Sequence, residues 1–335
     1  MNFARVFVVA ALAACLPSVE AQTPSYSILH IELVNATLYV RGFCSPSDNL
    51  NSNKLLTTVV GSRAQGWGVA DIVSVNGQPV KGNAFEVISA PLITPNAVPG
   101  SSGIGDVNAF PSPWDLVFLN LDGTLIGTIH IDGLGGPPRP PGAPKEITAS
   151  AWTVTGGTGA FFGVHGYFQP VQDSVSGERR TTDCEDPAYR RMNADPGGNK
   201  RHPILYLVPV TQPQVITTPN GPAVIHASDG SQVSAAKPAK AGEILTLFAS
   251  GLGPTRPGVD PGQPFPASPL QVVNSPVEVL VNGNSADVLY AGGYPGAVDG
   301  YQVNFRIPDG AGQGQASIQL TSAWIAGPTA NIPVQ

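Results

Sequence analysis

The chain has 335 residues, more than a single hydrophobic core usually organises, so its length predicts two domains. Only 12% of the residues are charged, while glycine (39) and proline (34) are abundant, which is typical of turn-rich β proteins. A net charge of -6 and a pI near 5.3 exclude the basic surface that nucleic-acid binding requires, so we expect no nucleic-acid partner.

The N-terminus has the pattern of a secretory signal, with one positive charge, an apolar run from Val6 to Leu16 and a small residue at Ala21. We expect cleavage after Ala21, which removes residues 1–21. The run Leu12-Ala13-Ala14-Cys15 also resembles a bacterial lipobox, in which Cys15 would be lipidated and become the first residue. No later segment approaches the roughly 18 apolar residues of a membrane helix. The mature protein is therefore expected to be secreted, periplasmic or held at the cell surface.

Two cysteines, Cys44 and Cys184, remain after cleavage behind Ala21. In an oxidising compartment they can form one disulfide bond, and the alternative is two unpaired buried thiols. Two cysteines alone cannot make a thiolate zinc site, and we expect neither a metal nor a cofactor.

Short apolar alternations separated by turn residues predict an all-β fold. Leu29, Ile31 and Leu33 alternate with polar residues, as in a half-buried strand. Asn76-Gly77, Asp122-Gly123 and Asn282-Gly283 predict hairpins, because these pairs tolerate the positive φ of type I′ turns.

A change in composition divides the chain. Prolines and polar residues interrupt the strand pattern at residues 210–222, which we interpret as a linker. Residues 25–209 then form the first domain, predicted to be an antiparallel β-barrel of about eight strands. Residues 223–335 have the size and turn spacing of an Ig-like β-sandwich.

Charged residues gather between Glu178 and Arg201, including the pairs Arg179-Arg180 and Arg190-Arg191. One interpretation is a solvated loop with exposed ion pairs. The other is a binding site at the mouth of the barrel for an anionic ligand or a partner, because paired arginines suit carboxylate or phosphate groups.

The glycine-rich stretch from Gly156 to Gly163 follows a predicted strand. A dinucleotide-binding loop would need a helix directly after it, and the residues that follow are strand-like, so we reject nucleotide binding. Positive φ at Gly156, Gly157 and Gly159 would instead allow a tight turn, after which Phe161 and Phe162 point to opposite faces.

No hydrolase, zinc-protease or phosphate-loop motif occurs in the sequence. The five histidines are scattered, and each is interpreted as a strand-face or loop residue. If the barrel were catalytic, His165 or His130 would be the general acid or base, because histidine titrates near neutral pH.

The second domain resembles the Solibacter-type uncharacterised C-terminal domain of Acidobacteria. The resemblance rests on Pro222 to Ala227, Gly242 to Pro254, Leu289 to Gly292 and Tyr301 to Phe305. It implies a secreted protein with an Ig-like, TIG-like sandwich and no known activity. The module ends many different exported proteins, which suggests a surface, sorting or assembly role.

The stretch from Thr155 to Gly163 is similar to strand-turn-strand motifs of allene oxide cyclase and dirigent-type barrels. The resemblance implies that an apolar small molecule binds in the barrel lumen. Such relatives commonly carry arginine where this chain has His165, and none of their catalytic residues can be matched here.

Three functions follow from these patterns. The first is a non-catalytic exported protein whose barrel binds an apolar small molecule or an extracellular protein or polysaccharide, with the Ig-like domain acting in surface presentation or assembly. The second is an isomerase or cyclase acting in the lumen, which requires His130 or His165 to face an open apolar pocket. The third, a carbohydrate-binding module, would need a planar row of exposed aromatic residues.

Overall fold

The computed structural model describes residues 26–41, 64–90, 110–135, 151–169, 178–181 and 200–335. Their regular structure consists of β-strands, which confirms the all-β prediction. In these ranges there is no helix long and apolar enough to cross a membrane.

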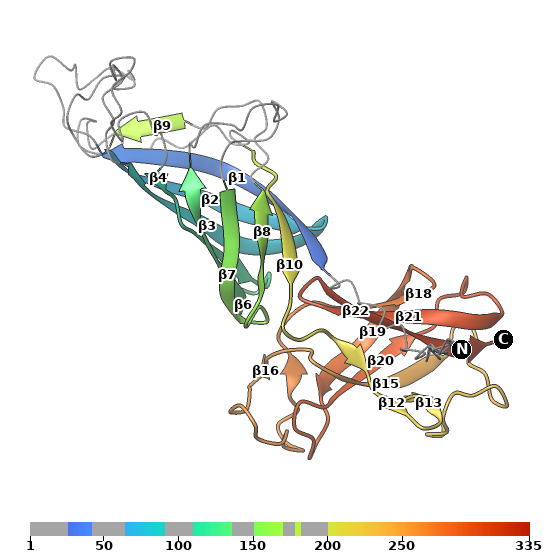
Figure 1. Ribbon diagram of the computed structural model, residues 1–335. Helices are drawn as coiled ribbons and strands as arrows, with labels where there is room; N and C mark the ends of the chain where they lie inside the picture. The colour runs from blue at the N-terminus through green and yellow to red at the C-terminus, as the bar shows by residue number, and fades with distance from the viewer. Residues whose placement is uncertain (1–25, 42–63, 91–109, 136–150, 170–177, 182–199) are drawn as a thin grey trace, which may run out of the picture.

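Eight antiparallel strands close into a barrel, as predicted (Figure 1). Their order around the barrel is β10-β8-β7-β6-β5-β3-β2-β1, and β1 returns to β10 where Ser27 pairs with Leu207 and His30 with Ile204. The strands are β1 (Ser27–Arg41), β2 (Ala64–Val75), β3 (Gln78–Ala90), β5 (Trp114–Leu119), β6 (Leu125–Gly135), β7 (Ala151–Gly159), β8 (His165–Gln169) and β10 (Ile204–Val208). Two short strands are added to them: β4 (Phe110–Pro111) pairs with β6, and β9 (Glu178–Thr181) runs parallel to β1.

The middle of the barrel is a packed apolar core. Alternate residues of each strand point inward, and the predicted alternation of Leu29, Ile31 and Leu33 is confirmed, since all three are buried. Phe118 and Phe161 pack against each other inside it, with ring centroids 5.1 Å apart. An eight-stranded barrel is just wide enough for its side chains to fill, and this one is filled.

A second, nearly closed sheet follows the barrel. Its order is β11-β15-β20-β19-β18-β21-β22, and β22 lies beside β11. Its strands are β11 (Gln214–Val215), β15 (Ile244–Ser250), β18 (Val277–Val281), β19 (Asn284–Gly293), β20 (Tyr301–Arg306), β21 (Gly314–Ser322) and β22 (Ile325–Val334). Short additions are β14 (Val224–His226), β16 (Thr255–Arg256) and β17 (Val272–Val273), while β12 (Thr217–Thr218) and β13 (Gly221–Pro222) form a separate ribbon. The segment expected to be a linker, residues 210–222, therefore contributes β11 to this sheet.

Two of the three predicted hairpin turns are confirmed as type I′ pairs. Asn76-Gly77 and Asn282-Gly283 have positive φ at both residues, from 49° to 78°. The Asp122-Gly123 turn also joins two paired strands, β5 and β6, as predicted, but only Gly123 has a positive φ. The Asp122 carboxylate accepts hydrogen bonds from the backbone N–H and the hydroxyl of Thr124, which stabilises a longer turn.

The glycine-rich stretch also differs in part from the prediction. Gly156 and Gly157 lie within β7 without positive φ, whereas Gly159 and Gly163 have φ of 61° and 71°. The turn therefore begins later than the sequence suggested. The opposite orientation of the two phenylalanines is confirmed, since Phe161 is buried and Phe162 is 79% exposed.

The turn between β21 and β22 closes one end of the barrel. Ala323 and Trp324 both have positive φ, 48° and 62°, which is uncommon for residues other than glycine. The two side chains belong to the core of the barrel rather than to that of the second sheet. The Trp324 ring lies 6.1 Å from Phe118, and its Nε1 donates a hydrogen bond of 2.8 Å to Oε1 of Gln78.

Candidate functional site

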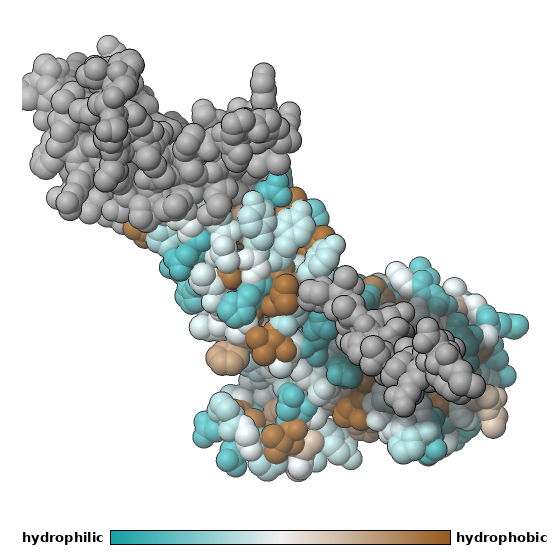
Figure 2. Space-filling model, viewed as in Figure 1, coloured by the Kyte–Doolittle hydropathy of each residue, from teal (hydrophilic) through white to brown (hydrophobic). Residues whose placement is uncertain are grey.

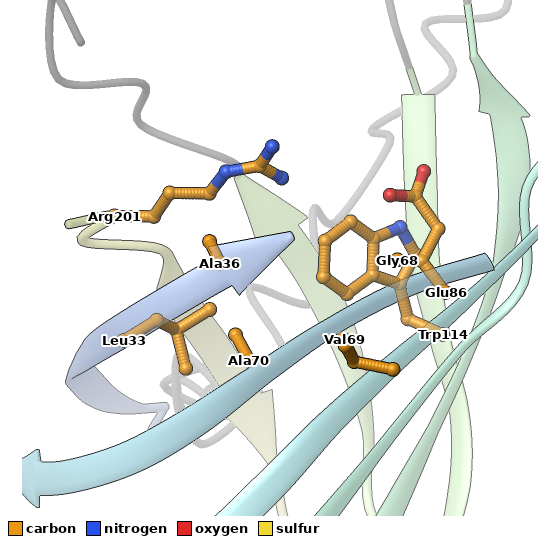
Figure 3. A pocket seen from close by; sticks show the side chains of 8 residues that line it. All are labelled: Leu33, Ala36, Gly68, Val69, Ala70, Glu86, Trp114 and Arg201. Carbon is orange, nitrogen blue, oxygen red and sulfur yellow. The ribbon is translucent and has the colours of Figure 1, made fainter. Parts of the chain in front are cut away.

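A pocket lies at the end of the barrel opposite Trp324. Trp324 contacts Gln78 at the start of β3, whereas the pocket surrounds Glu86, which is about 25 Å further along that strand at the usual rise per residue. The pocket encloses about 320 Å³, including the part open to solvent. It is lined by Leu33, Ala36, Gly68, Val69, Ala70, Glu86, Trp114 and Arg201 (Figure 3).

Glu86 points into the barrel, although its neighbours in sequence are apolar. It is 8% exposed, while Phe85 and Val87 on either side are 44% and 45% exposed on the outer face. Side chains of a strand alternate between its two faces, so the hydrophobic pattern alone would place Phe85 and Val87 inside and Glu86 outside. The structure has the reverse arrangement. Stability alone would favour the opposite arrangement, which indicates that the inward carboxyl group has another role.

Ser112 binds one oxygen of the Glu86 carboxyl group, and Trp152 fixes the backbone of Ser112. The Ser112 hydroxyl donates a hydrogen bond of 2.5 Å to Oε1 of Glu86. The backbone of Ser112 is itself fixed, because its N–H donates to Gly133 and its carbonyl accepts a hydrogen bond of 2.8 Å from Trp152 Nε1. The carboxyl group is therefore held in one position.

Trp114 turns a buried N–H group towards the pocket. Its Nε1 is buried and has no acceptor at ideal hydrogen-bond geometry among the described residues, but it faces the Glu86 carboxyl group and opposes the rise of its pKa. The ring packs against Phe168, with centroids 5.4 Å apart, so the indole cannot turn freely. A buried donor without an acceptor costs about 1 to 3 kcal/mol, and a ligand or water in the pocket could supply the acceptor.

Burial raises the pKa of the Glu86 carboxyl group above its ordinary value. The Ser112 hydroxyl, the positive charge of Arg201 and the nearby Trp114 indole oppose this increase but do not cancel it. The carboxyl group consequently accepts a proton more readily than an exposed glutamate does.

Gly68 makes room for that carboxyl group. It lies directly opposite Glu86 in the pairing of β2 with β3. A Cβ atom at this position would lie 3.0 Å from both Cβ and Oε2 of Glu86, closer than side chains normally approach. Any larger residue would displace the carboxyl group or fill the pocket.

Arg201 lines the other side of the pocket. Two backbone hydrogen bonds with Leu33, of 2.8 and 3.0 Å, fix its position beside β1. Figure 3 shows its guanidinium group and the Glu86 carboxyl group on opposite sides of the pocket, with the Trp114 ring between them and its nitrogen turned towards Glu86. Arg201 forms no ion pair with the described residues.

Arg201 ends the charged segment that the sequence singled out. The backbone of Arg179 and Arg180 lies in β9, paired with Leu38 and Tyr39 of β1. Arg190 and Arg191 lie outside the described residues, as do Cys44 and Cys184. The arginine site and the disulfide bond therefore stay predictions.

Neither histidine proposed as an acid or base faces the interior. His130 and His165 are exposed on the outside of the barrel, so the lumen reaction that required them has no support from their positions. His130 Nδ1 lies 2.5 Å from Oδ1 of Asp115, and its Nε2 lies 3.4 Å from the Thr128 hydroxyl. This resembles the order of groups in a hydrolytic triad, but about half of each charged side chain is exposed, which weakens the ion pair. No cluster of three metal-ligating residues occurs among the described residues.

The hydrophobic pattern did not reveal the pocket, but small residues near it carried a signal. Gly68, Ala70, Gly82 and Ala84 recur at every second position on the inner faces of β2 and β3. Glu86 continues the same series. A row of small residues ending in a carboxylate can indicate an inward-facing polar group.

The exposed apolar residues that the structure describes do not form a second candidate binding site. On the face shown in Figure 2 they form small separate groups among polar residues. Scattered apolar residues of this kind are normal for a protein surface.

The fold and the pocket define an all-β protein with a closed barrel and a buried carboxyl group at one end. In comparisons with known proteins, no family model, curated protein or solved structure matches the chain.

Proposed function

We propose that this is an exported two-domain protein that binds a small molecule at the Glu86 end of its barrel. The observation that carries the proposal is the buried, inward-facing Glu86 carboxyl group, with the Trp114 N–H, which has no well-formed hydrogen bond to the described residues, turned towards it. Both lower the stability of an otherwise apolar interior, and such exceptions occur mainly at functional sites. Because the core behind the pocket is packed, the apolar part of the ligand would extend through the open side.

The second domain is, in this proposal, an Ig-like module for surface presentation or assembly. Its size, its nearly closed β-sheet and its resemblance to the C-terminal module of acidobacterial secreted proteins support this role. The predicted signal at residues 1–21, or a lipid anchor at Cys15, would deliver both domains outside the cytoplasm.

The binding role can be tested by identifying ligands extracted from the natively purified protein by mass spectrometry. Gly68→Ala would push into Glu86 and should reduce the extracted ligand at least tenfold. Gly156→Ala is the matched control, because a Cβ at that barrel glycine meets no atom within 4 Å. Ligand bound equally by both variants, or absent from the wild-type protein, would contradict the proposal.

The alternative is an isomerase or cyclase that acts at the same pocket. The raised pKa of Glu86 favours it, because a general acid must keep its proton near the working pH. Glu86, and not His130 or His165, would then be the acid. Conversion of the extracted ligand by the wild-type protein but not by Glu86→Gln would support catalysis, whereas its recovery unchanged would support binding alone.

A further inference from the structure

We propose that the Glu86 pocket is a receptor for a carboxylate group, which Trp114 and Arg201 bind through their N–H groups and to which protonated Glu86 donates a third hydrogen bond. The inference rests on the proposed binding function and specifies the chemical class of its ligand. Nothing in the sequence pattern assigned these three residues to one site.

Two of the three polar groups can only donate hydrogen bonds. An indole N–H and a guanidinium group have no acceptor atoms. Among the described residues, Trp114 Nε1 has no acceptor at ideal hydrogen-bond geometry and Arg201 has no carboxylate in ion-pair contact. The missing partner is therefore an acceptor, and the charge of Arg201 favours an anion.

Glu86 decides between an anionic and a cationic ligand. If it were ionised, it would attract a cation and repel a carboxylate. Its burial raises its pKa, so the neutral form, which can donate a hydrogen bond to an anion, persists to higher pH than in an exposed glutamate. Ser112 already occupies Oε1, so Oε2, the oxygen nearest Gly68, is the atom left to carry the proton towards a ligand.

The size of the pocket limits what enters it. About 30 Å³ is open to the centre of a water molecule, and one water needs roughly 10 to 15 Å³ by the same measure. The pocket therefore holds about two or three waters, or one carboxylate head group in their place. Leu33 and Val69 line it and would contact the first carbon atoms of the ligand.

A matched series of fluorinated probes tests the charge preference on the full mature chain. We would titrate 4-fluorobenzoate, 4-fluorobenzamide and 4-fluorobenzylamine and measure binding by ¹⁹F NMR between pH 5 and 8. We expect 4-fluorobenzoate to bind most tightly, at least tenfold more tightly than the amine. Its affinity should fall as the pH rises, because ionised Glu86 repels it.

Three variants assign the effect to the pocket. Arg201→Gln should weaken 4-fluorobenzoate binding at least tenfold, while Lys200→Gln, which removes the neighbouring exposed charge, should change it less than twofold. Glu86→Gln keeps a donor but cannot ionise, so its affinity for 4-fluorobenzoate should no longer depend on pH. Near-ultraviolet circular dichroism checks that each variant is folded.

The outcomes separate this inference from the proposed function. Preferential binding of the benzamide or the benzylamine would overturn the carboxylate assignment and leave small-molecule binding intact. Binding of 4-fluorobenzoate that Arg201→Gln does not affect would place the anion elsewhere and overturn the assignment. If none of the probes binds while the natively purified protein carries a ligand in a Gly68-dependent way, the head group is not a carboxylate. If no probe binds and no ligand is extracted from the natively purified protein, both proposals fail.

Discussion

Glu86 makes the stability of the barrel depend on pH. Its pKa is higher in the folded protein than in the unfolded chain, so its favourable contribution is complete at acidic pH and is lost as the pH rises through the folded-state pKa. Glu86→Gln has no such dependence. We therefore expect the free energy of unfolding of the wild type to fall relative to that of the variant as the pH is raised from about 4.5 towards 8.

Urea denaturation at several pH values measures this difference. A difference in unfolding free energy between wild type and Glu86→Gln that stays constant with pH would show that the carboxyl group is not held in a desolvated site. A wild type that becomes relatively more stable at high pH would show the same.

Ser112 contributes the hydrogen bond on which the position of Glu86 depends. Ser112→Ala would leave Oε1 of a buried carboxyl group without its donor, and we expect a loss of about 1 to 3 kcal/mol in unfolding free energy. Thr158→Ala removes a comparable hydroxyl contact, to Thr128, on the exposed outer face and should cost under about 0.5 kcal/mol. Equal losses in the two variants would contradict the special role of Ser112.

At the residue scale, the sequence pointed to titratable side chains by their type and not by their position. Histidines stand out because they titrate near neutral pH, yet His130 and His165 lie outside the barrel. Glu86 did not stand out, because a carboxylate between Phe85 and Val87 normally faces solvent. Only the pairing of β3 with β2 and β5 shows that this alternation is inverted.

At the element scale, hairpins were predictable where the turn residues themselves determine the backbone. Asn76-Gly77 and Asn282-Gly283 adopt positive φ with little strain, and both lie where expected. The pair Ala323-Trp324 carries no such signal. Its backbone is held by contacts between two sheets that no local pattern encodes.

The backbone strain of the β21–β22 turn is offset by the contacts that its side chains make with the barrel. Replacing Ala323-Trp324 by Asn-Gly would improve the turn itself but remove the tryptophan that closes the barrel. Deletion of a buried tryptophan side chain costs about 3 to 5 kcal/mol, against roughly 2 to 4 kcal/mol of strain relieved over the two residues. The change also removes the hydrogen bond of Trp324 to Gln78 and the buried methyl group of Ala323, which brings the balance to a net loss. We therefore expect the double variant to be less stable than the wild type in urea denaturation.

Ala323→Gly is the control for this turn. It relieves strain at one residue and removes one buried methyl group, worth about 0.8 kcal/mol, so its stability should remain near that of the wild type. A double variant more stable than the wild type would mean that Trp324 contributes little to closing the barrel.

At the scale of the whole molecule, composition and turn spacing predicted the all-β class, because it depends on features repeated along the chain. The barrel was predicted from the strand count together with a resemblance to known barrels. The joining of the two sheets was not predictable, since it depends on single contacts between distant residues. Asn274 Nδ2 donates to the carbonyl of Leu125, and the Asn120 amide donates back to the carbonyl of Asn274. With Trp324, these contacts attach the second sheet to the end of the barrel away from the pocket.

This attachment should make the two sheets unfold together. If the second sheet unfolds, Trp324 leaves the barrel and exposes Phe118 and its neighbours, so the barrel is destabilised at the same moment. Scanning calorimetry of the mature chain should show one transition, with equal calorimetric and van't Hoff enthalpies.

Trp324→Ala should split the transition or lower the melting temperature of the barrel, by roughly 2 to 4 °C for each kcal/mol lost. Arg256→Ala removes only a half-exposed ion pair with Asp122 at the same junction and should leave one transition almost unshifted. Two separate transitions in the wild-type protein would show that the junction is too weak to couple the domains, and the pocket would then be independent of the second sheet.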